Sequence, residues 1–193
     1  PPNAACTFTL REGRTSQVIH DVVTRESQLG ILFLSHMNAR FLKDLFHKNK
    51  LEFTPLSAFT PCLYVRSGHP WQNFLTSFPA NQQLSLRRFE QGHDKSQFSE
   101  ELLLPNRASR QCIYVTDRST LFSIIRATDA YTIGTGHAAP SIIGRHLAVI
   151  PIENPLDTMT VGWIKMAGEP LSEEASHYIT ILTDLLRGRE NKE

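Results

Sequence analysis

The chain has 193 residues, of which 40% are hydrophobic and 20% are charged, and its formal net charge is +1. This composition is typical of a folded domain and excludes a disordered chain, while the near-neutral charge excludes a strongly basic nucleic-acid surface over the whole chain. Apolar runs without glycine, such as Ile31–Leu34, are far too short for a transmembrane helix, and no signal peptide is evident at the N-terminus. The cysteines are odd in number and far apart, which favours reduced thiols in a cytoplasmic protein: Cys6, Cys62 and Cys112.

The first third of the chain alternates between strand and helix patterns. Thr15 is predicted to cap a helix through about Arg25, whose apolar residues fall on one face. Ser35–Asn38 is predicted to be a loop, followed by a short helix marked by apolar residues between Phe41 and Phe46. Strands are predicted at Thr7–Arg11, Leu29–Leu34, Leu51–Ser57 and Cys62–Arg66. Pro55 and Pro61 favour edge or turn positions for the last two.

The rest of the chain repeats this alternation. Helices are predicted to begin at Ser96 or Ser99 and end near Leu104, to follow Asp117–Thr120, and to run from a cap at Ser172 to Arg187 before Gly188. Strands are predicted at Leu84–Phe89, Cys112–Thr116, Tyr131–Gly134, His146–Ile152 and Thr160–Lys165.

This order of elements predicts an α/β fold of two Rossmann-like lobes with parallel strands and a central cleft. The chain crosses between lobes twice, so that residues 1–68 and 157–193 form lobe I and residues 69–156 form lobe II. Ligands bind such folds where the carboxyl ends of strands and the N-termini of helices meet, which predicts a ligand site in the cleft.

Several polar residues follow strands or precede helices at that place. Asp117, Ser119 and Thr120 lie at a helix start, where they form either an anion site or a plain N-cap. Gly134 and Thr135 form either a close approach to a ligand or a tight turn. The remaining candidates are Ser35 and His36 after a buried strand, Thr60 before another, and Arg66, which either reaches the cleft or caps the crossover. Hydroxyls, an arginine and a helix N-terminus favour a small anion such as a carboxylate.

Motifs for other chemistry are missing from the sequence. The eight histidines are scattered without zinc-ligand spacing, so no metal is expected. Gly134-Thr135-Gly136 lacks the third glycine of a dinucleotide fingerprint, so no cofactor is expected. Cys112 is expected to be a core thiol, and no acid–base pair stands out, so we expect no enzyme activity.

Five segments, in this order and spacing, make the chain resemble the effector-binding domain of LysR-type bacterial transcription regulators. They are residues 9–13, 29–35, 65–70, 115–122 and 129–136. The resemblance implies a fold like that of type 2 periplasmic binding proteins, with a small metabolite bound between the lobes. It also implies a homodimer or tetramer whose geometry responds to the effector, and DNA binding only through a winged helix-turn-helix domain that this sequence lacks.

The same resemblance implies an N-terminally truncated domain, because the family's first strand and first helix have no counterpart here. That strand would lie between the strands predicted at Thr7–Arg11 and Leu29–Leu34. A different register, a fragment, or a strand from another chain would each account for the gap.

The sequence therefore favours an effector-sensing regulatory domain that acts in the cytoplasm and contacts no membrane. A solute-binding protein of a transporter shares the fold and is the alternative. An enzyme on the same scaffold ranks third, because fold alone does not decide function.

Overall fold

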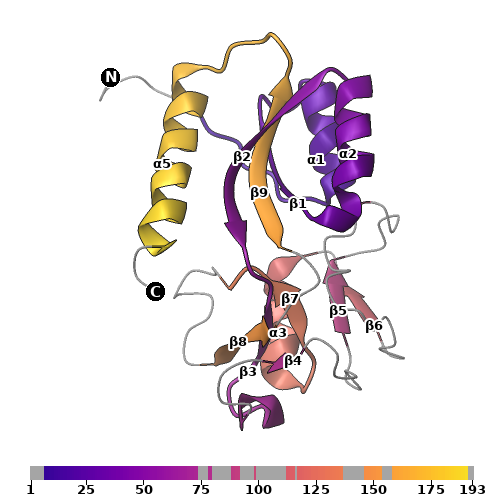
Figure 1. Cartoon of the computed structure of the whole chain (residues 1–193), viewed down its shortest axis with the longest axis vertical. Helices are drawn as coiled ribbons and strands as arrows, with labels where there is room; N and C mark the ends of the chain where they lie inside the picture. The colour runs from indigo at the N-terminus through magenta and orange to yellow at the C-terminus, as the bar shows by residue number, and fades with distance from the viewer. Residues whose placement is uncertain are drawn as a thin grey trace.

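A computed structural model of the chain describes residues 7–73, 78–79, 88–91, 98, 112–115, 117–136, 146–153 and 158–190. Two sheets occupy the upper and lower halves of the molecule, and long strands connect them (Figure 1). The helix predicted near Leu104 lies outside the described residues except for Phe98, as do residues 84–87 and most of the second crossing.

The upper sheet has three strands in the order β1 (Gly30–Leu34), β9 (Met159–Met166) and β2 (Leu51–Phe59). Helices α1 (Thr15–Val23) and α2 (His36–Lys48) lie on one side of it, and α5 (Glu173–Glu190) lies on the other, alongside β2 (Figure 1). The core of this half lies between the sheet and the first two helices, and is formed by Ile19, Val22, Leu32, Leu34, Leu42, Phe46, Leu51 and Ile164. Residues three or four apart on α1 and α2 supply this core, which is the helical period that the sequence showed.

The lower sheet has the order β4 (Phe78–Pro79), β8 (Leu147–Glu153), β3 (Cys62–Arg66) and β7 (Thr132–Gly134). Residues of β3 alternate between the two faces: Leu63 and Val65 join one core cluster, while Tyr64 joins another beneath α3 (Arg118–Ala127). A separate pair, β5 (Arg88–Gln91) and β6 (Cys112–Val115), stands beside them (Figure 1).

The prediction of parallel neighbouring strands is wrong for most pairs. In the upper sheet β9 runs antiparallel to both β1 and β2, and in the lower sheet β3 runs antiparallel to β7 and β8. β1 and β2, which are joined by α2, do point the same way, because each runs antiparallel to β9. However, β9 returns from the other half and inserts between them, and a returning strand must run in the opposite direction. Only β4 with β8 and β5 with β6 are parallel among the described pairs.

The strands on either side of the two crossings pair with each other. β2 leads into β3 through Thr60 and Pro61, and β8 leads back towards β9; β2 pairs with β9, and β3 pairs with β8. β2 is an edge strand with a bulge between Pro55 and Ser57, which confirms the prediction drawn from its proline. None of the described helices combines the length and apolar character that a bilayer span requires.

Several predicted element ends change in the structure. Residues 36–38, predicted as a loop, are the first turn of α2, with Ser35 as its N-cap. Thr15 is the first residue of α1 rather than its cap, which is Arg14. The predicted strand at Thr7–Arg11 is extended chain without a strand partner, with Phe8 70% and Leu10 87% exposed. The last helix continues through Gly188 to Glu190 instead of ending before it.

Candidate functional site

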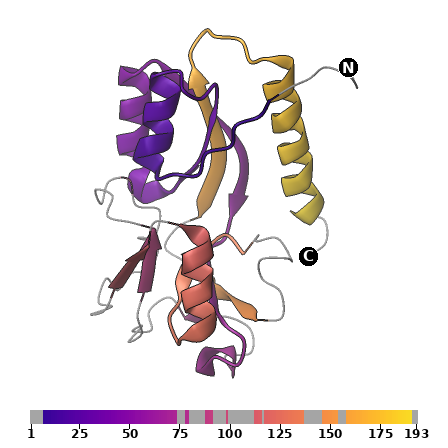
Figure 2. The same ribbon diagram turned by 180° about the vertical axis from the view of Figure 1, so that it is seen from behind.

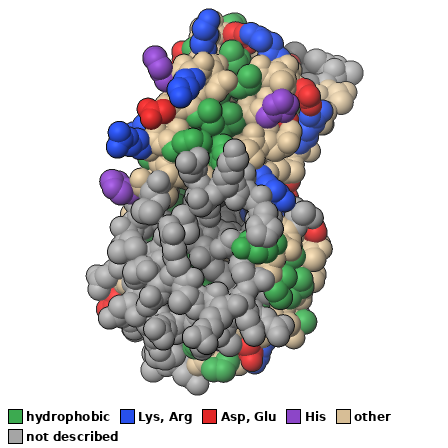
Figure 3. Space-filling model, turned by 90° about the vertical axis from the view of Figure 1, so that its right-hand side faces the viewer, with side chains coloured by type: hydrophobic (Ala, Val, Ile, Leu, Met, Phe, Trp, Pro, Cys, Tyr) green, Lys and Arg blue, Asp and Glu red, His purple; other side chains and the backbone are tan. Residues whose placement is uncertain are grey.

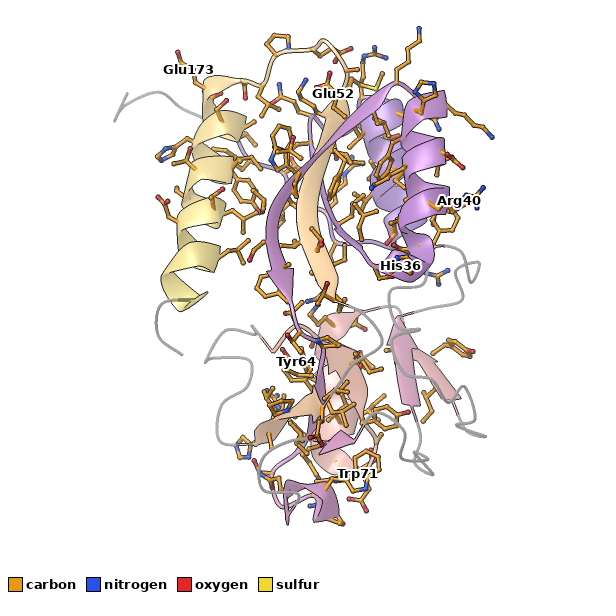
Figure 4. All side chains as sticks on the ribbon, viewed as in Figure 1. His36, Arg40, Glu52, Tyr64, Trp71 and Glu173 are labelled. Carbon is orange, nitrogen blue, oxygen red and sulfur yellow. The ribbon has the colours of Figure 1, made fainter. Side chains whose placement is uncertain are left out.

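Two helices, α2 and α3, begin on the side of their own half that faces the other half of the molecule. α2 begins at its lower end, at His36, next to the lower half (Figure 4). The preceding strand brings it there, because Phe33 of β1 packs against the core cluster of the lower sheet. α3 begins close to the segment before α1, since Arg118 Nε donates to Glu12 Oε1 at 2.8 Å. Helix N-termini carry partial positive charge, so this boundary is suited to an anion.

The start of α3 is capped by Asp117. Its carboxylate accepts the backbone N–H of Thr120 at 2.7 Å, and hydrogen bonding to Thr120 lowers the pKa of Asp117 below its ordinary value. Ser119 and Thr120 stand exposed in the first turn. The prediction that this segment caps a helix is therefore confirmed. The hydroxyls of Ser119 and Thr120 remain candidates for ligand contact.

The ion pair between Arg118 and Glu12 links α3 to the segment that precedes α1. Both side chains are about half exposed, at 54% and 56%. An exposed pair of this kind adds little stability. The pair matters because of its location: it places the carboxylate of Glu12 next to the N-terminus of α3. The sequence showed no signal for this pairing, which joins residues 106 positions apart.

The start of α2 is held by a reciprocal cap. The backbone N–H of Ser35 donates to Asn38 Oδ1 at 2.8 Å, and both side chains are buried, at 4% and 1% exposed. His36, the first residue of the helix, is exposed. The signal for Asn38 was present as a Ser-x-x-Asn spacing, a variant of the capping box in which glutamate or glutamine is usual.

Thr60, Gly134 and Thr135 come together at the end of the lower sheet that faces the upper half. Cys62, two residues after Thr60, pairs with Gly134 across β3 and β7. A Cβ on Gly134 would lie 2.5 Å from Tyr64 Cε2, so packing against the Tyr64 ring accounts for this glycine. Gly136 has φ of +77°, which favours glycine at the turn that follows.

Arg66 lies at the opposite end of β3 from this group. Its Nε and Nη2 bond Asp129 Oδ1 at 2.7 and 2.6 Å, in the turn between α3 and β7. The start of α2, the start of α3 and the end of β7 each lie towards the boundary between the two halves, whereas Arg66 lies at the far end of β3 with Asp129. Beside that pair His69 is 1% exposed; its Nδ1 accepts the N–H of Trp71, and burial lowers the pKa of its ring.

The outer face of the upper half carries charges of mixed sign. The side of the molecule that presents α1 and α2 carries interspersed basic, acidic and histidine side chains above the undescribed part (Figure 3). In the residues that the structure describes, no group of three or more His, Cys, Asp or Glu could hold a metal ion.

Comparisons with known proteins support the fold. No protein-family model matches the chain, and no curated protein matches it either. Among solved structures, the chain is similar to the reduced form of the OxyR regulatory domain from Pseudomonas aeruginosa, with 19% identity over 92% of this chain and 78% of that one, at a TM-score of 0.58. It is similar to the effector-binding domain of QuiR in complex with shikimate, with 14% identity over 92% and 79% of the two chains and a TM-score of 0.60.

A third similar structure is HinK, a LysR family transcriptional regulator from Pseudomonas aeruginosa. The identity is 12% over 93% of this chain and 58% of that chain, with a TM-score of 0.56. The chain thus spans somewhat more than half of such a regulator. The chain has the mixed α/β fold of the effector-binding and regulatory domains of LysR-type regulators, which confirms the resemblance seen in the sequence.

Proposed function

We propose that this chain is the effector-sensing domain of a LysR-type transcription regulator and that it binds a small anionic metabolite between two lobes. The observation that carries the proposal is that α2 and α3 both begin at the boundary between the two sheets, in a fold shared with such domains. The similar QuiR domain holds shikimate, which is a carboxylate.

The proposed lobes follow the type 2 periplasmic-binding-protein plan. Residues 1–68 and 157–193 form lobe I, and residues 69–156 form lobe II, with β3 reaching from the first lobe into the lower sheet. On this plan Ser35 and His36 line the site from lobe I, while Ser119, Thr120 and Thr135 line it from lobe II.

Sensing would work by a shift of population between two arrangements of the lobes. An effector shifts that equilibrium only by the difference between its affinities for the two arrangements. A strong shift needs roughly 5 kcal/mol, which a few hydrogen bonds to a charged group, at about 1.5–3 kcal/mol each, would supply. The effector is bound and released without chemical change, so the domain acts as a sensor and not as an enzyme.

In the whole regulator the domain would act in the cytoplasm as part of a homodimer or tetramer. DNA would be contacted by a winged helix-turn-helix domain that is not part of this sequence. The alternative, a solute-binding protein of a transporter, has no observation in its favour.

A ligand screen with matched variants tests the proposal. The chain is melted with a panel of small carboxylates, phosphates, amino acids and sugars, and hits are titrated by calorimetry. We expect an anionic hit that Ser119→Ala with Thr120→Ala weakens at least tenfold, while the control Ser176→Ala with Thr180→Ala on α5 leaves its affinity unchanged. A hit that is consumed during the titration, or one equally weakened by the control, would contradict the proposal.

A further inference from the structure

Asn38 carries an unusual polar atom. It is the third residue of α2, its side chain is 1% exposed, and its Oδ1 accepts the N–H of Ser35. An N–H can only donate, so this bond fixes which end of the amide faces Ser35. Nδ2 is then buried without a hydrogen-bond partner, and it is the only such buried side-chain atom in the described part of the chain.

Capping does not explain this amide. Buried donors are almost always paired, and an unpaired one needs a reason. The cap uses only Oδ1, and an aspartate would supply the same acceptor with a negative charge that a helix N-terminus favours. The cap therefore leaves the NH2 group of Asn38 without a role.

The position of the amide indicates what it could serve. Because Oδ1 reaches back to Ser35, the side chain lies at the N-terminal end of α2, which faces the lower half of the molecule (Figure 4). The buried NH2 group and the helix N-terminus at this place both favour an acceptor without a proton. A carboxylate oxygen has that character and gains from both.

We propose that Asn38 is a specificity-determining residue of the ligand site, whose Nδ2 donates a hydrogen bond to a carboxylate oxygen of the effector. This inference rests on the proposed function and names the class of ligand and the residue that selects it. Since Nδ2 is closed from solvent in this structure, ligand binding must move the residues around it apart, as a shift between two lobe arrangements would.

The decisive variant is Asn38→Asp. It keeps the shape of the side chain and the acceptor for Ser35 N–H, and replaces the donor with a second acceptor that carries a negative charge. The matched control is Asn49→Asp at the other end of α2, where Nδ2 donates to Leu45 O at 2.8 Å. Both variants add the same charge to the same helix.

The probes are acetate, succinate, benzoate and shikimate, together with their uncharged methyl esters, titrated into the full chain by calorimetry and by 15N NMR. The Asn38 side-chain NH2 signals are identified as those missing from Asn38→Asp. We expect an acid of the panel to bind and to move these signals. Asn38→Asp should lower the affinity for that acid at least tenfold, which is about 1.4 kcal/mol. The affinity of Asn49→Asp for the same acid should stay within twofold of that of the unaltered chain.

Three results would overturn the inference. The first is an Asn38→Asp chain that binds the acid as tightly as the unaltered chain does. If Ser119→Ala with Thr120→Ala still weakens binding in that case, the proposed function stands and only the role of Asn38 is refuted. The second is a methyl ester that binds as well as its acid, which refutes a carboxylate at this place. The third is an Asn38 NH2 signal that no acid moves, which means that the donor serves an internal water only; the wider screen then judges the proposed function separately.

Discussion

Substituting Gly134 with alanine tests the register of β3 and β7 at the edge of the site. The new Cβ would lie 2.5 Å from Tyr64 Cε2 and 3.2 Å from Cδ2, whereas carbon atoms in contact lie about 3.5–4 Å apart. The ring has no free space to retreat into, because Tyr64 is 4% exposed and packs edge-on against Phe122 with 6.0 Å between ring centroids.

Overpacking of this kind destabilises by about 1–3 kcal/mol. In a domain of this size each kcal/mol lowers Tm by roughly 2–4 °C, so Gly134→Ala should lower Tm by roughly 2–12 °C in a thermal melt followed by circular dichroism. Gly13→Ala is the control, because its Cβ would meet only Gln17 side-chain atoms, the nearest at 3.4 Å.

A double variant isolates the contact. Tyr64→Leu removes the ring atoms that the new Cβ would meet, so Gly134→Ala should be much less destabilising in that background. A Gly134→Ala chain that melts at the temperature of the unaltered protein would refute the pairing of Cys62 with Gly134. An equal loss of stability in both backgrounds would refute the clash.

Three further outcomes follow from other parts of the structure. Burial lowers the pKa of His69, so the unfolded chain binds more protons below about pH 6.5; stability should fall as pH drops below that value, and urea melts of His69→Gln should show a smaller fall. Glu12→Gln removes the carboxylate that pairs with Arg118, so calorimetry should show an anionic effector binding several-fold tighter; unchanged or weaker binding would place the effector away from α3. Ser172→Ala removes the acceptor for Ala175 N–H at the start of α5 and should destabilise by about 1 kcal/mol in urea denaturation, and a neutral effect would exclude this cap.

Local patterns predicted the elements whose signals lie within a few residues. The strand Cys62–Arg66 has the predicted bounds, Asp117 caps α3, and the Ser172 hydroxyl caps α5 as expected. Each depends on a short alternation or on one polar side chain next to a helix start. Such signals need no knowledge of the rest of the chain.

The errors arose where distant residues decide the structure. The place of β9 between β1 and β2 depends on a strand more than 100 residues away, so the sequence order suggested parallel neighbours instead. The alternation in Thr7–Arg11 is suited to a strand, but a strand also requires a neighbour that pairs with its backbone.

The site could be predicted only in part for the same reason. The place of Asp117, Ser119 and Thr120 at a helix start could be predicted because the residues lie next to one another in the sequence. Glu12 could not be predicted, because its partner Arg118 is distant in the chain. Asn38 was missed because residues 35–38 contain a single apolar residue and were predicted to be a loop, and the closely spaced apolar residues of α2 begin at Phe41.

The account as a whole depends on one ligand touching both halves of the molecule. α3 and the lower sheet stand apart from α1, α2 and the upper sheet in both ribbon views (Figure 2), so hydrogen–deuterium exchange can report on the two sides separately. The full chain is measured by mass spectrometry with and without a saturating carboxylate from the panel. We predict slower exchange in the first turns of α2 and α3 together, with α5 unchanged. Protection confined to one of these turns, or found on α5 instead, would contradict a site shared between the two halves.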